Sequence, residues 1–304
     1  MSDRSFPFDP AHCELCPRRC GADRARRAGF CTAPDGAVVR HTMLHRFEEP
    51  CVAGADPARG AGTVFFAGCT MRCVYCQNAA ISRRADGDAL SPHALAEMFL
   101  DLQDRGAYTL DLVSPTPYAP YIAQALDSLG ERLTVPVVWN TGGFERPETV
   151  RALAPWVGVW LTDVKYADGD LAARYGATAD YPQIAIDALR AMVDAAGEPR
   201  YAELADGSRI MTRGVIVRHL VLPGHRRDSE AALRSIADAV GAESVVLSLM
   251  AQYTPGFAPP EFPELSRRVT TFEYERAAAV ARELGFSGYT QERESASAAY
   301  TPEF

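Results

Sequence analysis

All eight cysteines of the chain fall within its first quarter, and none follows Cys76. A secreted protein held together by disulfides would rarely leave three quarters of its length without a bridge. In an intracellular chain, such clustering indicates metal or iron–sulfur ligation. The eight positions are Cys13, Cys16, Cys20, Cys31, Cys51, Cys69, Cys73 and Cys76.

An apolar core of ordinary size is expected, because 47% of the 304 residues are hydrophobic and 23% are charged. The net charge of −8 argues against a nucleic-acid-binding protein, since such proteins are more often basic. The N-terminal residues lead into no apolar targeting segment, and no apolar run approaches the length that a bilayer requires. We therefore expect a soluble cytoplasmic protein with no nucleic-acid or membrane partner.

Two regions of different sequence character meet near residue 55. Residues 1–55 are rich in cysteine and arginine and lack apolar periodicity, which is typical of a small module stabilised by metal. Residues 56–304 alternate strand-like and helix-like segments, which predicts βαβ units and a parallel sheet. Six such units favour an α/β fold of the partial (β/α)6 TIM-type barrel over a doubly wound sheet. In either fold, functional sites lie at the C-terminal ends of the strands.

The expected elements follow from apolar runs and helix-start signals such as Ser91 before Pro92. The polar segment 196–208 predicts a hairpin-like insertion, and the proline-rich segment 256–263 predicts a loop. Strands are expected at 62–69, 109–113, 135–139, 157–164, 214–221 and 244–249, with a short last strand at 288–291. Helices are expected at 92–102, 119–129, 148–153, 182–196, 229–240 and 272–284.

Cys69, Cys73 and Cys76 have the spacing C-x3-C-x2-C and directly follow the first of these strands. Three thiolates in one tight loop can hold a four-iron cluster and leave one iron open for a substrate or cofactor. Tyr75, an aromatic residue directly before the last cysteine, strengthens this interpretation. A zinc-binding loop is the alternative.

This cysteine loop resembles that of the radical S-adenosyl-L-methionine superfamily. Further motifs, in order along nearly the whole chain, resemble the uncharacterised branch of that superfamily related to the pyruvate formate-lyase activating enzymes. The motifs are VYCQN (74–78), LVSPTPY (112–118), WNTGG (139–143), TDVKY (162–166), VRHLVLPGH (217–225) and SLMAQYTP (248–255).

The resemblance implies that Cys69, Cys73 and Cys76 hold a 4Fe-4S cluster whose open iron binds S-adenosyl-L-methionine. One electron from the reduced cluster would cleave the sulfonium C–S bond and form a 5′-deoxyadenosyl radical, which abstracts hydrogen from a substrate. An oxidoreductase of the activating-enzyme type would act on a partner protein such as a glycyl-radical enzyme. It would receive electrons from a flavodoxin or a ferredoxin. Burial of the cluster protects the radical from water and oxygen.

The resemblance also assigns residues to the cofactor. Tyr75 would lie near the adenine. The family's Gly-Gly-Glu element, which meets the methionyl amino group, is replaced by Ser114-Pro115-Thr116-Pro117, where the hydroxyls of Ser114 and Thr116 and backbone carbonyls could accept the same hydrogen bonds. An ordinary proline-rich turn is the alternative for this segment.

The ends of the next strands carry further candidates. Asn140 and Thr141 match positions that hold a monovalent cation in the activating enzymes, with Asn in place of an acid. Asp163 and Lys165, the only lysine of the chain, match the family well and point to one face, although a surface ion pair is the alternative. Arg218 stands where the family places a basic contact to the cofactor.

The remaining cysteines form a second candidate site. Cys13, Cys16, Cys20 and Cys31 supply four thiolates, which suit either structural zinc or an auxiliary 4Fe-4S cluster, with free structural cysteines as the alternative. Cys51 is expected to be a plain buried thiol.

Two other function classes remain open at this point. The chain could be an iron–sulfur electron carrier or scaffold without radical chemistry, although a carrier gains nothing from an open iron. It could also be a zinc-stabilised interaction module on an inactive barrel.

Overall fold

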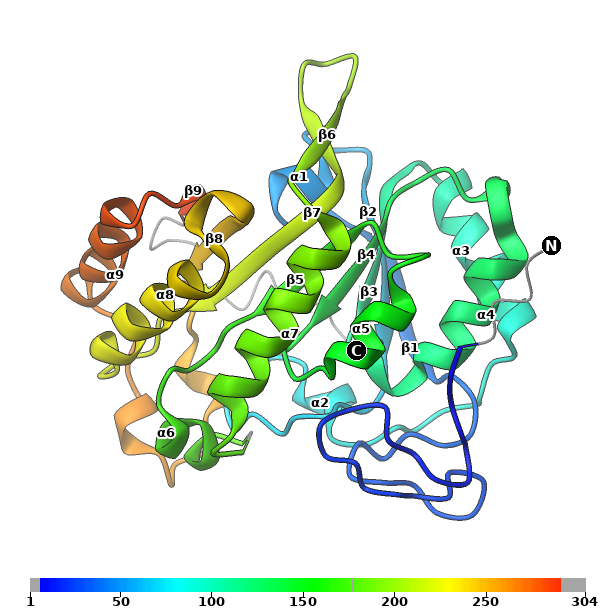
Figure 1. Ribbon diagram of the computed structural model, residues 1–304, viewed down its shortest axis with the longest axis horizontal. Coiled ribbons are helices and arrows are strands. Elements are labelled where there is room, and N and C mark those ends of the chain that lie inside the picture. The colour runs from blue at the N-terminus through cyan, green and yellow to red at the C-terminus, as the bar shows by residue number, and fades with distance from the viewer. Residues whose placement is uncertain (1–5, 177, 291–304) are drawn as a thin grey trace.

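The computed structural model describes residues 6–176 and 178–290, and nine strands within these ranges build its sheet (Figure 1). They are β1 (Val39–His45), β2 (Gly60–Phe66), β3 (Ala107–Val113), β4 (Val137–Thr141), β5 (Val159–Asp163), β6 (Arg200–Glu203), β7 (Arg209–Leu220), β8 (Val246–Met250) and β9 (Ser287–Thr290).

The order of the strands is β1-β2-β3-β4-β5-β7-β8-β9, and β6 pairs with β7 outside this path. Along this path, every pairing from β2 to β9 is parallel, whereas β1 runs antiparallel to β2 at one edge. The sheet ends at β1 and β9 and does not close. This arrangement confirms the predicted partial α/β barrel.

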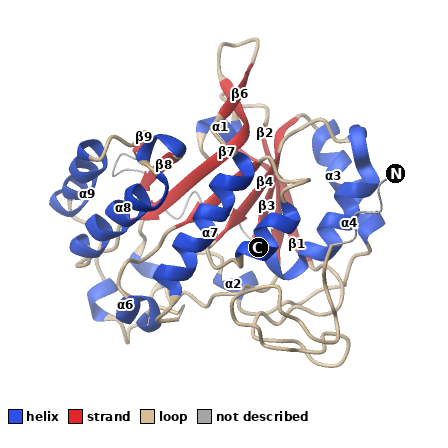
Figure 2. Ribbon diagram, in the orientation of Figure 1, coloured by secondary structure: helices blue, strands red, loops and turns tan. Residues whose placement is uncertain are grey.

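The longer helices cover one face of the sheet, and most neighbouring helices pack against each other (Figure 2). The short helices α1 and α2 lie in the connections on either side of β2. The helices are α1 (Pro50–Ala53), α2 (Ala79–Ser82), α3 (Pro92–Asp104), α4 (Ala119–Leu129), α5 (Pro147–Leu153), α6 (Gly169–Arg174), α7 (Tyr181–Ala196), α8 (Arg226–Val240) and α9 (Thr271–Glu283).

Local sequence explains where these helices begin. The Ser91 side chain accepts a hydrogen bond from the Ala94 amide (3.2 Å), and Pro92 occupies the first turn of α3, as its sequence predicts. Helix α9 starts with a capping box in which Thr270 and Glu273 satisfy each other's backbone amides. The boundaries of both helices are therefore encoded in a few neighbouring residues.

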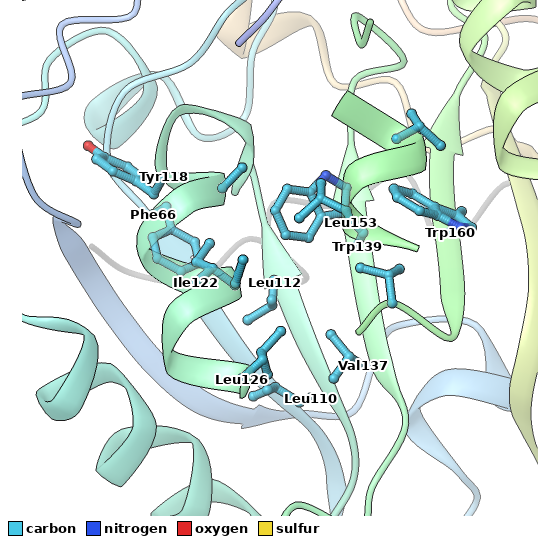
Figure 3. Packing of buried hydrophobic residues seen from close by; sticks show 14 of the residues in the cluster. Phe66, Leu110, Leu112, Tyr118, Ile122, Leu126, Val137, Trp139, Leu153 and Trp160 are labelled. Atoms are coloured by element: carbon cyan, nitrogen blue, oxygen red, sulfur yellow. The ribbon is translucent and has the colours of Figure 1, made fainter. Parts of the chain in front are cut away.

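The central strands β2, β3, β4, β5 and β8 are buried on both faces, so their side chains divide between two cores. Trp139 and Trp160, with ring centroids 6.4 Å apart, pack between the sheet and the helices (Figure 3). Their neighbours Val138 and Val159 point to the opposite face and fill the inside of the barrel. The carboxyl ends of the parallel strands are thereby held in one rigid rim.

The antiparallel strand β1 is a feature that sequence periodicity did not predict. Its sequence, VRHTMLH, mixes charged and apolar residues, and only His45 at its end is buried. It lies within the range 1–55 that was expected to form the N-terminal module, yet it belongs to the sheet. The division into residues 1–55 and 56–304 itself stays a prediction.

The insertion at 196–208 is a hairpin, as expected: β6 pairs antiparallel with the first part of β7, which extends farther than the predicted 214–221. Figure 1 shows this hairpin at the end of the sheet opposite the N-terminal loops. Those loops, residues 6–38, contain no helix or strand, only isolated bridges such as that between Cys13 and Ala22. No helix within the described ranges is long and apolar enough to span a bilayer.

Candidate active site

A cleft of about 270 Å³ opens at the carboxyl ends of the parallel strands. The loop that joins β2 to α2 supplies all three cysteines of the C-x3-C-x2-C motif to this cleft. The Met71 amide donates to the Cys69 sulfur at 3.4 Å and fixes the first turn of the loop. The structure therefore brings Cys69, Cys73 and Cys76 together at one rim position.

The cysteine loop is also held from outside, by the connection between α6 and α7. The Arg72 amide donates to the Gly176 carbonyl, and the Val74 amide donates to the Tyr175 carbonyl, both at 3.0 Å. A Cβ at Gly176 would lie 2.0 Å from the Arg72 carbonyl oxygen, and Gly176 has φ +114°. Only glycine permits this close approach of the two backbones. The close approach and the two hydrogen bonds together hold the cysteine loop in place.

The opposite wall of the cleft carries polar side chains from the ends of three successive strands. Ser114 follows β3, Asn140 and Thr141 end β4, and Asp163 ends β5. The Lys165 side chain forms an ion pair with Asp163. The Lys165 backbone amide donates a hydrogen bond to the Tyr181 hydroxyl oxygen at 3.0 Å. These side chains face the three cysteines across the cleft.

The electrostatics of this pair favour a charged lysine. Burial alone would lower the pKa of Lys165, but the Asp163 carboxylate, together with the nearby Cys73, Tyr181 and Tyr75, raises that pKa well above its ordinary value. Both side chains are about one-fifth exposed, at 20% and 21%. A permanent positive charge thus stands inside the cleft, close to the Cys73 sulfur.

Tyr75 lies among other tyrosines at the side of the cleft. Its hydroxyl is 2.5 Å from that of Tyr166, and its ring meets Tyr175 and Tyr253 edge-on, with centroids 6.3 and 5.9 Å away. Burial raises the pKa of Tyr75 well above its ordinary value, so the phenol stays neutral. Tyr75 forms part of an aromatic wall that lines the cysteine loop.

Arg218 reaches the cleft from β7 but is already engaged by two carboxylates. It donates to Glu49 at 2.6 and 2.7 Å and contacts Glu48, both in the segment between β1 and α1. Asp111 lies nearby, and burial raises its pKa well above the ordinary value. Arg218 therefore belongs to a buried charged floor under the cleft.

Thr116 does not line the cleft with the other candidates. It belongs to a short 3-10 helix, and its hydroxyl donates to Glu145, which also accepts from the Thr141 hydroxyl. Burial raises the pKa of Glu145 to about 7, against the lowering effect of the two threonines. Because Thr141 lines the cleft and Thr116 lines a second cavity, Glu145 lies between two sites.

That second cavity, of about 20 Å³, gathers the N-terminal cysteines. Cys13 is buried, Cys16 and Cys31 are half-buried, and Cys20 is exposed. Arg18 and Arg24 also line the cavity, together with Thr70 and Thr116 from the barrel. All four cysteines of the expected set, Cys13, Cys16, Cys20 and Cys31, line this cavity.

Sequence reasoning missed several residues of this region. Glu49 and Glu145 stand in segments without periodicity, where a glutamate is usually solvated, and no local signal marks either as buried. His45 and Glu48 also belong to this buried region, since both side chains are less than one-tenth exposed. Cys51, by contrast, is a buried thiol as predicted, at 2% exposure.

The fold and site together define an open α/β barrel that presents three cysteines and a polar wall at its carboxyl rim. The sequence matches the family model of the Radical SAM superfamily over residues 63–236, more than half of the chain. The chain belongs to this superfamily, and membership implies a 4Fe-4S cluster and S-adenosyl-L-methionine as cofactors.

The residues present fit such a cluster. Burial raises the pKa of the Cys69 thiol to about 11 and that of Cys73 to about 12, although Lys165 opposes both shifts. Iron would bind these residues as thiolates, so cluster binding would have to displace their protons. Thiolates are the ligands that iron–sulfur clusters take in proteins, and three of them line one cleft here.

Among known proteins, the chain is similar to the uncharacterized protein MJ0674 of Methanocaldococcus jannaschii, with 27% identity over 276 residues that cover 88% of this chain and 73% of that protein. Among solved structures, Streptococcus suis SuiB bound to the precursor peptide SuiA gives a TM-score of 0.49 at 14% identity, over 75% of this chain and 48% of SuiB. SuiB alone gives 0.48 at 12% identity, over 74% and 47%. The chain spans about half the length of SuiB.

Proposed function

We propose that this chain cleaves S-adenosyl-L-methionine reductively in the rim cleft and abstracts hydrogen from a substrate. The observation that carries the proposal is the placement of Cys69, Cys73 and Cys76 in the same cleft as the polar ends of β3, β4 and β5. When bound, the cluster and cofactor supply one-electron cleavage of a sulfonium C–S bond and a carbon-centred radical.

The chain's own residues would bind and orient the cofactor. The Lys165 ammonium, fixed by Asp163, suits the methionyl carboxylate. The Asn140 side chain and the hydroxyls of Ser114 and Thr141 suit the methionyl amino group, since each offers an oxygen acceptor on the cleft wall. The Tyr75 ring would lie beside the adenine and help to exclude water.

The substrate we propose is a protein or peptide, in the manner of the activating enzymes. The sheet does not close, and the exposed ring of Phe47, at 63% exposure, lines the cleft from the side of the β1–α1 segment. An open, partly apolar entrance suits a large partner better than an enclosed pocket would.

A flavodoxin or a ferredoxin would supply the electron. None of the eight cysteines, all in the described chain, forms a disulfide, which suits a cytoplasmic enzyme.

The test is anaerobic reconstitution followed by dithionite-driven turnover, with 5′-deoxyadenosine and methionine measured on the same sample. We expect both products in equal amounts from the wild-type chain. Lys165→Met should weaken binding of S-adenosyl-L-methionine by about tenfold to a hundredfold, since a charge-assisted contact contributes about 1.5–3 kcal/mol. Lys165→Arg, which keeps the positive charge, is the matched control and should lose less.

An electron carrier is the second candidate, because two cysteine sets lie close together in the structure. The same sample distinguishes the two candidates. A reduced cluster whose EPR spectrum ignores added S-adenosyl-L-methionine, with no 5′-deoxyadenosine formed, would contradict the proposed enzyme and support the carrier.

A further inference from the structure

The N-terminal cysteine segment lies directly against the loop that carries Cys69. A Cβ at Gly68 would stand 2.3 Å from the Cys31 carbonyl oxygen, and Gly68 has φ +74°. Any side chain at this position would push the two segments apart. The backbone of one cysteine set therefore touches the residue next to a cysteine of the other.

A stack of three side chains strengthens this contact. The Arg18 guanidinium lies 3.5 Å from the centroid of the Phe30 ring, and the Arg72 guanidinium lies 4.1 Å from the same centroid. Arg18 Nε also donates to the Thr70 carbonyl at 2.7 Å, and Arg72 Nη2 donates to the Phe30 carbonyl at 2.9 Å. Each segment thus contributes a cation that binds the backbone of the other.

The N-terminal site also connects this contact to the protein surface. Cys31 lies on the side of the cysteine loop, whereas Cys20 is exposed. The arginines of the segment divide in the same way: Arg18 lines the cavity, but Arg19, Arg26 and Arg27 are exposed. Between residues 18 and 28, around Cys20, the exposed charged side chains are all arginines, whereas Asp9, Glu14 and Asp35 are exposed elsewhere in the segment.

We propose that Cys13, Cys16, Cys20 and Cys31 hold an iron–sulfur cluster that relays single electrons to the site at Cys69, Cys73 and Cys76. The exposed arginines would receive an acidic one-electron donor protein, because opposite charges steer and orient such encounters. The relay role rests on the proposed function, whereas the metal assignment stands by itself.

Contact with the cleft loop favours a redox cluster over a structural metal ion. A zinc ion that only stabilised residues 6–38 would need no junction with Cys69, since four thiolates complete its shell. Here the junction lies against the reactive loop, and the Arg18 cation lines the N-terminal cavity beside Thr70. A cation in this place stabilises the extra negative charge of a reduced cluster on either side.

The electron balance is simple. The donor protein loses one electron, the N-terminal site gains it and passes it to the site at Cys69, and no bond forms or breaks in these two steps. The electron is consumed only when the sulfonium C–S bond is cleaved. Arg18 acts as a positioning residue throughout, because it would touch neither the substrate nor the transferred hydrogen.

The experiment counts iron and zinc on the full chain after anaerobic reconstitution. A potentiometric titration of the same sample, monitored by EPR, then counts the one-electron transitions. We expect about 8 Fe per wild-type chain and two one-electron transitions. The double variant Cys16→Ala/Cys20→Ala, which leaves only two of the four thiolates, should retain about 4 Fe and one transition that still responds to S-adenosyl-L-methionine. Cys51→Ala, which removes a buried thiol outside both sets, is the matched control and should retain all iron.

Electron delivery is measured by driving turnover with reduced flavodoxin or with dithionite. The rate with flavodoxin, divided by the rate with dithionite, should fall at least tenfold in Cys16→Ala/Cys20→Ala and in Arg18→Met. Arg18→Lys should restore part of this ratio. One zinc and about 4 Fe in the wild-type chain would overturn the proposal, as would an unchanged ratio. A full iron count without cleavage under dithionite would refute the proposed function but leave the metal assignment standing.

Discussion

The two cysteine sets of this protein are built on very different supports. Cys69, Cys73 and Cys76 follow a buried strand, and their loop starts at the sheet and is held along its length by the α6–α7 connection. Cys13, Cys16, Cys20 and Cys31 lie in a segment without helix or strand.

The segment with four cysteines depends on side-chain bonds to the barrel. Arg24 donates to the Pro117 carbonyl at 2.5 Å, and the Thr149 hydroxyl donates to the Leu15 carbonyl at 2.8 Å. A site on a strand end is positioned by the fold, whereas a site on such loops needs its ligand to order it. The difference teaches that the barrel strands position one set, whereas the other set depends on side-chain contacts with the barrel.

The largest expected effect would test whether the two sites assemble separately. Cys73→Ala should reduce cleavage of S-adenosyl-L-methionine to background, because a cluster iron loses its ligand, while about 4 Fe stay bound at the N-terminal set. Iron analysis with the cleavage assay measures both effects. A chain that loses all of its iron would instead show that the N-terminal site forms only beside a complete cleft.

Next in size is the charged floor beneath the cleft. Arg218→Met leaves Glu48 and Glu49 buried without their cation, which should lower the free energy of unfolding by about 3–5 kcal/mol. Urea unfolding measures the loss. The triple variant Glu48→Gln, Glu49→Gln and Arg218→Met should recover most of it, and a triple variant as unstable as the single one would contradict the charge explanation.

Glu145, which lies between the two sites, should give a pH-dependent effect of about 3 kcal/mol. Burial raises its pKa from an ordinary 4.5 to about 7, so the folded state binds a proton that the unfolded chain releases. This contribution is fully present below about pH 4.5 and is lost as the pH rises through 7.

The comparison is between wild type and Glu145→Gln, which keeps an acceptor for Thr116 and Thr141. Urea unfolding of the cluster-free chains is measured at pH 5, 6, 7 and 8. As the pH rises, the free energy of unfolding of wild type should fall relative to that of the variant. Parallel pH curves would mean that Glu145 ionises normally.

The smallest effect concerns Ser114, which has φ +56° at the end of β3. A non-glycine residue in this region costs of order 1 kcal/mol or more, so Ser114→Gly should stabilise the fold by about 1 kcal/mol or leave it unchanged. Thermal unfolding measures the difference. A loss of more than 1 kcal/mol would show that the Ser114 hydroxyl makes a stabilising contact that outweighs the strain.

Sequence reasoning predicted the parts of this molecule in which local pattern and global fold agree. Helix α3 has its cap and its apolar spacing, and the cysteine loop follows an unbroken apolar strand. Ser114, Asn140, Thr141, Asp163 and Lys165 line one cleft because parallel strands end at the same rim. Their roles toward the cofactor stay predictions.

The parts that sequence could not predict depend on long-range packing. Thr116 turns away from the cleft because the 3-10 helix after β3 rotates its hydroxyl toward Glu145. Arg218 meets Glu49 across 169 positions of sequence, a contact that no local pattern encodes. Strand β1 is assigned to the sheet by its pairing with β2 rather than by its own composition.

The Asp163–Lys165 pair has a practical consequence. Because the 304 residues contain a single lysine, an amine-directed reagent meets one side-chain amine in the chain, and it lies inside the cleft. Asp163 keeps that amine protonated and therefore slow to react. The extent of labelling, read by mass spectrometry on an arginine-cleaved digest, becomes a direct measure of whether the cleft is filled or open.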